Sequence, residues 1–201
     1  MADLEIACVC GQVKGMFRNT GPGYGSRVIC YCRDCQAAAH HLGHPEALDE
    51  CGGTDLFITT PERMELQSGA DKLGCFRFSP NGPRRWYTTC CNTHLGNTTH
   101  DAATPFISLN LACATPATRP VVGQSTRGMM VRDARNEPNL PRKIAGMSRK
   151  LLFEVVLRTL FATLRGKRGT TPFVRDGKPV AEAVMLSREV RAEALASAGF
   201  K

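Results

Sequence analysis

The sequence lacks a hydrophobic run long enough to cross a membrane, which takes roughly 20 consecutive apolar residues. The most apolar stretch, residues 148–164, is shorter and is interrupted by Arg158. The first residues also lack a basic segment followed by an apolar one, so the sequence predicts no secretory signal peptide. We therefore expect a cytoplasmic protein, in which cysteines stay reduced and serve metals or catalysis.

Aromatic residues are scarce, and the last third of the chain has few acidic ones. Residues 1–124 hold 10 Lys+Arg and 11 Asp+Glu, whereas residues 125–201 hold 16 and 7, so the net charge of +8 divides into −1 and +9. A basic tail attracts phosphates in a salt-dependent manner. One alternative function is therefore a non-catalytic, zinc-stabilised binding module whose tail contacts nucleic acid or an anionic membrane surface. Only four aromatic side chains lie in this tail, which therefore offers no stacking platform for bases.

Cysteine is abundant, and seven of the ten cysteines fall into three clusters. The clusters are Cys8 and Cys10; Cys30, Cys32 and Cys35; and Cys90 and Cys91, with His94 three residues further on. Gaps of one or two residues place several sulfurs on one turn, which suits zinc better than disulfide pairing. The isolated cysteines are predicted to fill the core as small apolar residues; they are Cys51, Cys75 and Cys113.

The first and third clusters together predict a closed metal site. Cys8, Cys10 and Cys91 would supply three ligands, and either Cys90 or His94 would supply the fourth. Such a site ties the N-terminal turn to a distant strand, so that metal binding contributes to the free energy of folding. For His94, a surface position beside Thr93 is the alternative.

The middle cluster predicts a metal site with an open position. Three thiols within six residues leave the fourth tetrahedral position free, as in a catalytic zinc site. Zinc held there could bind a thiolate or polarise a carbonyl, so Cys32 is a catalytic candidate. His40 is a second candidate, because it follows the cluster within two helical turns and could accept a proton. The alternatives are a site closed by a distant cysteine and a polar helix face that carries His40.

Short segments punctuated by glycine and proline predict a mainly β fold. The expected strands are residues 12–17, 27–31, 56–60, 72–78, 84–89 and 106–111. A short helix is expected at 37–44, a strong one at 148–164 and a terminal one at 188–198. The apolar face of residues 148–164 is expected to dock on the β-domain or on a second subunit, with contact to anionic lipid as the alternative.

The cysteine pattern resembles that of the glutathione-dependent formaldehyde-activating enzyme (GFA) family. The resemblance covers residues 5–115 and rests on Cys8-Val-Cys10-Gly11 and on Cys30-Tyr-Cys32-Arg-Asp-Cys35. The third family motif, F-C-x-x-C-G, is not matched: Thr88 stands where its first cysteine belongs if its last is aligned with Cys91. The resemblance implies a β-tent fold of short antiparallel strands, a structural zinc held by the first and third motifs and a second zinc held by the middle one.

The resemblance also implies a function and a domain layout. The implied activity is that of a zinc-dependent carbon–sulfur lyase acting on S-hydroxymethylglutathione or a similar thiol–aldehyde adduct. We expect two zinc ions per chain, glutathione or another small thiol as partner, and a possible homo-oligomer. Arg33, Arg84 and Arg85 are the candidates to bind substrate carboxylates. The expected layout is a zinc-binding β-domain at 1–115, an irregular connection at 116–145 and a basic helical extension at 146–201.

Overall fold

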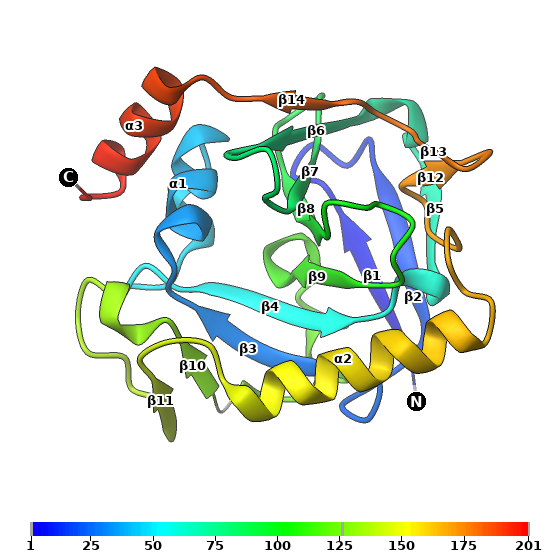
Figure 1. Ribbon diagram of the computed structural model, residues 1–201, viewed down its shortest axis with the longest axis horizontal. Coiled ribbons are helices and arrows are strands. Elements are labelled where there is room, and N and C mark those ends of the chain that lie inside the picture. The colour runs from blue at the N-terminus through cyan, green and yellow to red at the C-terminus, as the bar shows by residue number, and fades with distance from the viewer. Residues whose placement is uncertain (1, 126, 201) are drawn as a thin grey trace.

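The computed structural model describes residues 2–125 and 127–200, and its strands form two main sheets (Figure 1). The smaller sheet has the order β1-β2-β5, with β1 (Ala2–Ala7), β2 (Lys14–Thr20) and β5 (Met64–Ser68). The larger has the order β11-β10-β3-β4-β9-β8-β7-β6-β14. Its members are β3 (Ser26–Cys30), β4 (Thr54–Thr59), β6 (Leu73–Arg77), β7 (Arg84–Thr88), β8 (His94–Thr98), β9 (Ile107–Asn110), β10 (Arg127–Met129), β11 (Arg142–Ile144) and β14 (Ala183–Met185).

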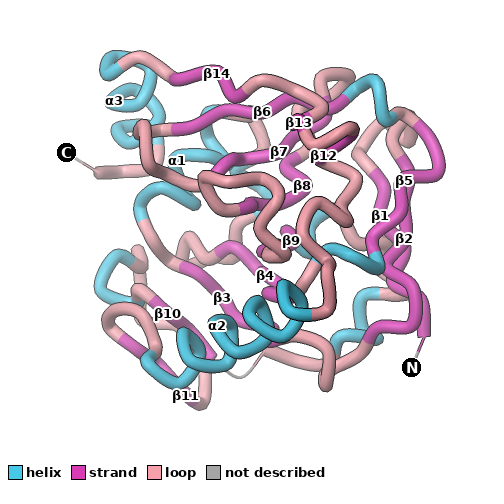
Figure 2. Tube along the Cα trace, turned by 45° about the vertical axis from the view of Figure 1, so that its right-hand side comes forward, coloured by secondary structure: helices cyan, strands magenta, loops and turns pink. Residues whose placement is uncertain are grey.

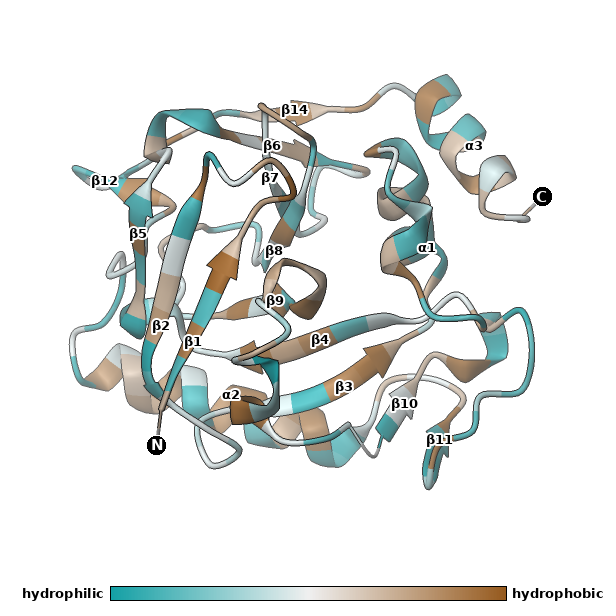
Figure 3. Ribbon diagram, turned by 180° about the vertical axis from the view of Figure 1, so that it is seen from behind, coloured by the Kyte–Doolittle hydropathy of each residue, from teal (hydrophilic) through white to brown (hydrophobic). Residues whose placement is uncertain are grey.

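The main hydrophobic core lies between these two sheets. In β1, Leu4 and Ile6 are buried while the intervening Glu5 is exposed. Figure 3 shows hydrophilic and hydrophobic residues alternating along this strand. These side chains pack in one cluster with Trp86 and Leu109 of the larger sheet. Period-two alternation is typical of a strand with one buried face. The apolar face of the smaller sheet therefore packs on the larger sheet. The expected mainly β fold is confirmed.

The last third of the chain extends the larger sheet at both ends (Figure 2). At one end β10 pairs in parallel with β3 and with β11; at the other, β14 pairs in parallel with β6. The residues expected as an irregular connection thus contribute two short strands. Phe173, which follows them, is fully buried and stacks on Trp86 with ring centroids 4.6 Å apart. Phe173 therefore packs in the same core as the strands of residues 1–115.

The described residues include three α-helices, which pack beside the sheets. They are α1 (Arg33–His41), α2 (Arg149–Leu164) and α3 (Arg188–Ser197), and a two-stranded hairpin of β12 (Val174–Arg175) and β13 (Lys178–Pro179) precedes β14. Ser148 and Ser187 cap α2 and α3, each accepting a hydrogen bond from a first-turn N–H. α3 packs against α1 through a small cluster that includes Ala38 and Ala194. All three helices lie within about four residues of where the sequence predicts them.

Helix α2 packs against the larger sheet with only part of its surface. Leu151 and Ala162 are buried, whereas a broad apolar face stays exposed. The exposed side chains are Leu152, Phe153, Val156, Leu160, Phe161 and Leu164. Docking on the β-domain is thus confirmed for one face of the helix. Within the described residues, no helix has the length and apolarity needed to cross a membrane.

Candidate metal centres

The first and third cysteine clusters meet where two tight turns face each other. Cys8 and Cys10 lie on the turn after β1, and Cys90 and Cys91 lie on the turn between β7 and β8. The first turn passes through Gly11 with φ +73°, a left-handed conformation that glycine adopts without steric cost. The fold thus brings together two pairs of thiols that are about 80 residues apart in sequence.

The spacing of these four sulfurs matches a tetrahedral metal. The Sγ–Sγ distances are 3.5 Å for Cys8–Cys10, 3.8 Å for Cys8–Cys90, 3.4 Å for Cys10–Cys90 and 3.8 Å for Cys90–Cys91. Tetrahedral zinc with Zn–S bonds of about 2.3 Å places its sulfurs about 3.8 Å apart. All four ligand atoms lie within 4.8 Å of one another. The four-thiol group could therefore hold one metal ion.

Hydrogen bonds from the surrounding protein reach two sulfurs of this group and favour the thiolate of Cys91. The Val13 N–H donates to Cys8 Sγ at 3.2 Å, and the hydroxyls of Thr88 and Thr93 lie 3.4 and 3.2 Å from Cys91 Sγ. Desolvation raises the pKa of Cys91, but the two hydroxyls and contacts with Cys10 outweigh it and bring the pKa to about 5. The thiolate is the form that binds metals.

Of the two predicted candidates for the fourth ligand, Cys90 lies in the four-thiol group and His94 does not. The Ala112 N–H donates to Asn110 Oδ1, so Asn110 Nδ2 faces His94 Nδ1 at 3.3 Å. His94 Nδ1 must therefore accept, and Nε2 donates to Asn97 Oδ1 at 3.0 Å. Burial, followed by the charge of Arg85, lowers the pKa of His94 to about 4. His94 is a neutral core residue with both ring nitrogens occupied, whereas the sulfur of Cys90 lies with those of Cys8, Cys10 and Cys91.

The middle cluster forms a second group of three thiols where β3 passes into α1. Cys30 ends β3, Cys32 is the N-cap of α1, and Cys35 lies in its first turn. Their sulfurs lie within 4.8 Å of one another, so this three-thiol group could hold a second metal ion. Cys30 and Cys35 are buried in an apolar cluster, while Cys32 is only partly buried. Access from solvent is therefore greatest at Cys32.

A buried arginine, Arg85, lies beside the three-thiol group, a position that the sequence does not predict. Arg85 is 3% exposed; its Nη1 donates to Asn97 Oδ1 at 3.3 Å, and its Nη2 lies 3.7 Å from Asp34. Hydrogen bonds from neighbouring thiols, followed by the charge and a hydrogen bond of Arg85, lower the pKa of Cys35 well below its usual range. A buried cation is costly without a compensating charge, and the Asp34 carboxylate together with a Cys35 thiolate can supply it. No alternation in the sequence reveals this role, because Arg85 and its neighbour Trp86 are both buried in β7.

The histidines of α1 lie outside the three-thiol group. His40 Nε2 accepts a hydrogen bond from Arg135 at 3.0 Å, and the ring lines a surface cavity of about 490 Å³ with Arg33. His44 contacts the carbonyl of Cys91 at 2.8 Å and Glu46 at 2.7 Å. No histidine joins either thiol group within residues 2–125 and 127–200. His40 is thus near the cluster in sequence but is not placed as a metal ligand.

The three isolated cysteines stand apart from both groups. Cys75 and Cys113 are each 2% exposed and belong to the main core, which confirms the core-filling prediction for them. Cys51 is only partly buried and lies outside the core clusters of the described chain.

Comparisons with known proteins place the chain in a family. Among curated proteins, none matches this sequence. A crystal structure of a Rhodobacter sphaeroides protein is similar with a TM-score of 0.41 and 15% sequence identity, covering 60% of this chain and 96% of that one. The model of a family of unknown function, DUF6151, matches residues 2–184. This match spans most of the sequence, and the chain belongs to the DUF6151 family.

Proposed function

We propose that the protein is a zinc protein with one structural and one reactive site. The four-thiol group is the structural site, because its four sulfurs fill a tetrahedron and leave no position for a substrate. The three-thiol group is the reactive site, because it leaves one position free and Cys32 is partly exposed. The observation that carries the proposal is this division of seven thiols into a group of four and a group of three.

Although the third GFA motif is not matched, the chain still has four thiols for the structural site. Thr88 stands where that motif has its first cysteine, yet its hydroxyl lies 3.4 Å from Cys91 Sγ. The adjacent pair Cys90 and Cys91 supplies both sulfurs to the four-thiol group. The chain thus retains four ligands with a changed spacing, as a closed zinc site requires.

The surroundings of the three-thiol group stabilise negative charge on its sulfurs. Cys32 and Cys35 lie at the N-terminus of α1, where the helix dipole favours negative charge. Arg85 offsets the net negative charge that three thiolates leave on a divalent ion. Val28 and Leu151 pack around the group and exclude water. Bound zinc would supply Lewis acidity, which stabilises a substrate thiolate or polarises a carbonyl oxygen.

The proposed substrate is an adduct of a small thiol with an aldehyde, in line with the resemblance to the GFA family. The cavity of about 490 Å³ beside the N-terminus of α1 is lined by Arg33, Arg132 and Arg135, which can bind carboxylates such as those of glutathione. His40 lines the same cavity. Burial and then the charge of Arg135 lower the pKa of His40, so its ring is neutral near pH 7 and can accept a proton.

Metal analysis tests the two sites. We expect two zinc ions per chain in protein purified under reducing conditions, and one in a folded Cys32→Ser variant. Cys113→Ser is the matched control, because this buried thiol belongs to neither group, and it should keep both ions. One zinc in the wild type, lost on Cys32→Ser, would leave the four-thiol group without a metal. Absence of zinc in the wild type would refute the proposal.

Turnover of glutathione with formaldehyde tests the chemistry. Exchange between glutathione and S-hydroxymethylglutathione can be followed by NMR, with catalysis seen as added line broadening. We expect the wild type to accelerate the exchange and Cys32→Ser to lose the acceleration. A protein that holds two zinc ions yet gives no acceleration would be a zinc-binding protein without this lyase activity.

A further inference from the structure

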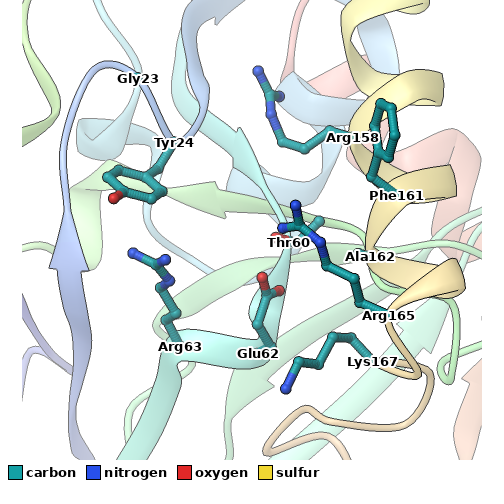
Figure 4. A pocket seen from close by; sticks show the side chains of 10 residues that line it. All are labelled: Gly23, Tyr24, Thr60, Glu62, Arg63, Arg158, Phe161, Ala162, Arg165 and Lys167. Atoms are coloured by element: carbon teal, nitrogen blue, oxygen red, sulfur yellow. The ribbon is translucent and has the colours of Figure 1, made fainter.

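A cavity of about 560 Å³ opens between α2 and the loops that flank β2 and β4, away from both thiol groups (Figure 4). Four cationic side chains line it, from two segments far apart in sequence: Arg63 from the loop after β4, and Arg158, Arg165 and Lys167 from α2 and the residues that follow it. Glu62 is the one acidic residue of the lining. The lining therefore carries three net positive charges.

These cations are not neutralised by the protein. Within the described part of the chain, none of the four forms an ion pair. Arg63 donates to the Asn19 carbonyl at 2.7 Å and stacks on the Tyr24 ring at 4.1 Å from its centroid. Arg158 donates to the Ile58 carbonyl at 3.3 Å. Several like charges in one concave site repel one another unless an anion enters.

Two further features of the lining indicate which chemical groups a ligand would need. Figure 4 shows the Glu62 carboxylate between Arg63 on one wall and Arg165 and Lys167 on the other. One oxygen of this carboxylate is buried and has no hydrogen-bond partner among the described residues. A buried acceptor without a partner is costly, and a hydroxyl or amino group of a ligand would satisfy it. The rings of Tyr24 and Phe161 form the apolar part of the lining.

We propose that this cavity is a binding site for a phosphate group carried by a small polar headgroup that also offers a hydroxyl or amino donor. Arg158, Arg165 and Lys167 bind the phosphate oxygens, since charge-assisted hydrogen bonds from arginine and lysine are the common way to bind phosphate. Glu62 accepts from the donor. The same chemistry occurs in a soluble phosphate ester and in the headgroup of an anionic lipid.

Two probes with one headgroup distinguish these sources. Glycerol 1-phosphate is titrated by calorimetry, and binding to vesicles with about 30 mol% phosphatidylglycerol in phosphatidylcholine is measured by cosedimentation. The test variant is Arg165→Gln/Lys167→Gln, because both side chains are exposed and form no ion pair with another described residue. The matched control is Arg149→Gln/Lys150→Gln, which removes the same charge from the other end of α2, outside the cavity.

We expect the test variant to weaken binding of at least one probe by about tenfold or more, and the control by about twofold or less. Binding of glycerol 1-phosphate alone indicates a soluble ester. Vesicle binding that the test variant loses indicates a lipid headgroup. Failure of the wild type to bind either probe at low salt would overturn the proposal. Equal weakening in the test and control variants would overturn it too, because the attraction would then be unspecific.

Discussion

At the scale of single residues, Arg85 links the three-thiol group to the core. Its guanidinium is buried beside Cys35 and Asn97, and its Nε has no hydrogen-bond partner among the described residues. Replacing it with Met removes the positive charge that offsets the thiolates and keeps much of the volume. We expect Arg85→Met to lower the metal affinity of this group by about 10- to 100-fold, measured by competition with a chromophoric chelator.

The neighbouring arginine provides the control for this experiment. Arg84 donates to the His100 carbonyl at 3.0 Å instead of approaching the three-thiol group. Arg84→Met should therefore leave the metal affinity within about twofold of wild type. Equal losses in both variants would mean that Arg85 does not stabilise bound metal specifically.

His94 makes the stability of the fold depend on pH. Its pKa is about 4 in the folded chain and about 6.5 when unfolded. Between these pH values the unfolded chain binds more protons, so the free energy of unfolding decreases as the pH falls from about 6.5 towards 4. Above pH 6.5 the contribution of the neutral ring is complete. At about 1.4 kcal/mol per pKa unit, the total loss from this group is roughly 3 kcal/mol.

Urea unfolding at pH 7 and pH 5 measures this effect. The wild type should lose about 2 kcal/mol more than His94→Gln between these pH values, while the exposed control His100→Gln should behave as wild type. Comparing variants at each pH cancels the acid sensitivity of the cysteine groups, which all three proteins share. A His94→Gln variant with the same pH dependence as wild type would contradict the prediction.

At the scale of elements, the segment between α2 and β14 belongs to the main core. Phe173 is fully buried and stacks on Trp86 of β7. We expect Phe173→Ala to lower the free energy of unfolding by about 3–5 kcal/mol, because the cavity remains where the ring was. Val184 in β14 is 61% exposed, so Val184→Ala should cost about 0.5 kcal/mol or less. Denaturant unfolding checks both values, and a small loss for Phe173→Ala would place the segment outside the cooperative core.

Strands with clear apolar character were predictable, and those that depend on distant partners were not. The six strands expected from residues 12–111 overlap β2, β3, β4, β6, β7 and β9. β1, β5 and β8 are not among the predicted strands. In β8, His94, Asn97 and Thr98 are polar yet buried, held by a hydrogen-bond network that only the fold creates. β10, β11 and β14 are each three residues long, which is too short for a periodicity to detect, and they form by pairing at the free edges of the sheet.

The same distinction holds for the metal centres. Local spacing identified Cys30, Cys32 and Cys35, because three thiols on one turn meet whatever the rest of the chain does. The choice between Cys90 and His94 needed the fold, since Asn92 at φ +54° turns the chain and aims both cysteines at the first cluster. Arg85 could not be assigned from spacing, because its approach to Cys35 depends on how β7 packs against α1.

At the scale of the whole molecule, the two thiol groups should contribute unequally to stability. The four-thiol group joins residues 82 positions apart, whereas the three-thiol group spans five positions. In the loop-entropy description of a cross-link, closing the longer loop constrains the unfolded chain by about 4–5 kcal/mol and closing the shorter one by about 2 kcal/mol. Removing a ligand from the four-thiol group should therefore lower the free energy of unfolding more than removing one from the three-thiol group.

We expect Cys90→Ser to lower the melting temperature of the metal-loaded protein further than Cys32→Ser does, by several degrees for each kcal/mol of difference. The loss should also be local. Cys8 and Cys10 follow β1 directly, so hydrogen exchange in β1 and β2 should rise in Cys90→Ser while exchange in β3 and α1 stays near wild type. Cys32→Ser should show the reverse pattern. Equal melting temperatures with uniform exchange in the two variants would mean that neither group ties its own part of the fold, because a metal cross-link stabilises the segments it joins.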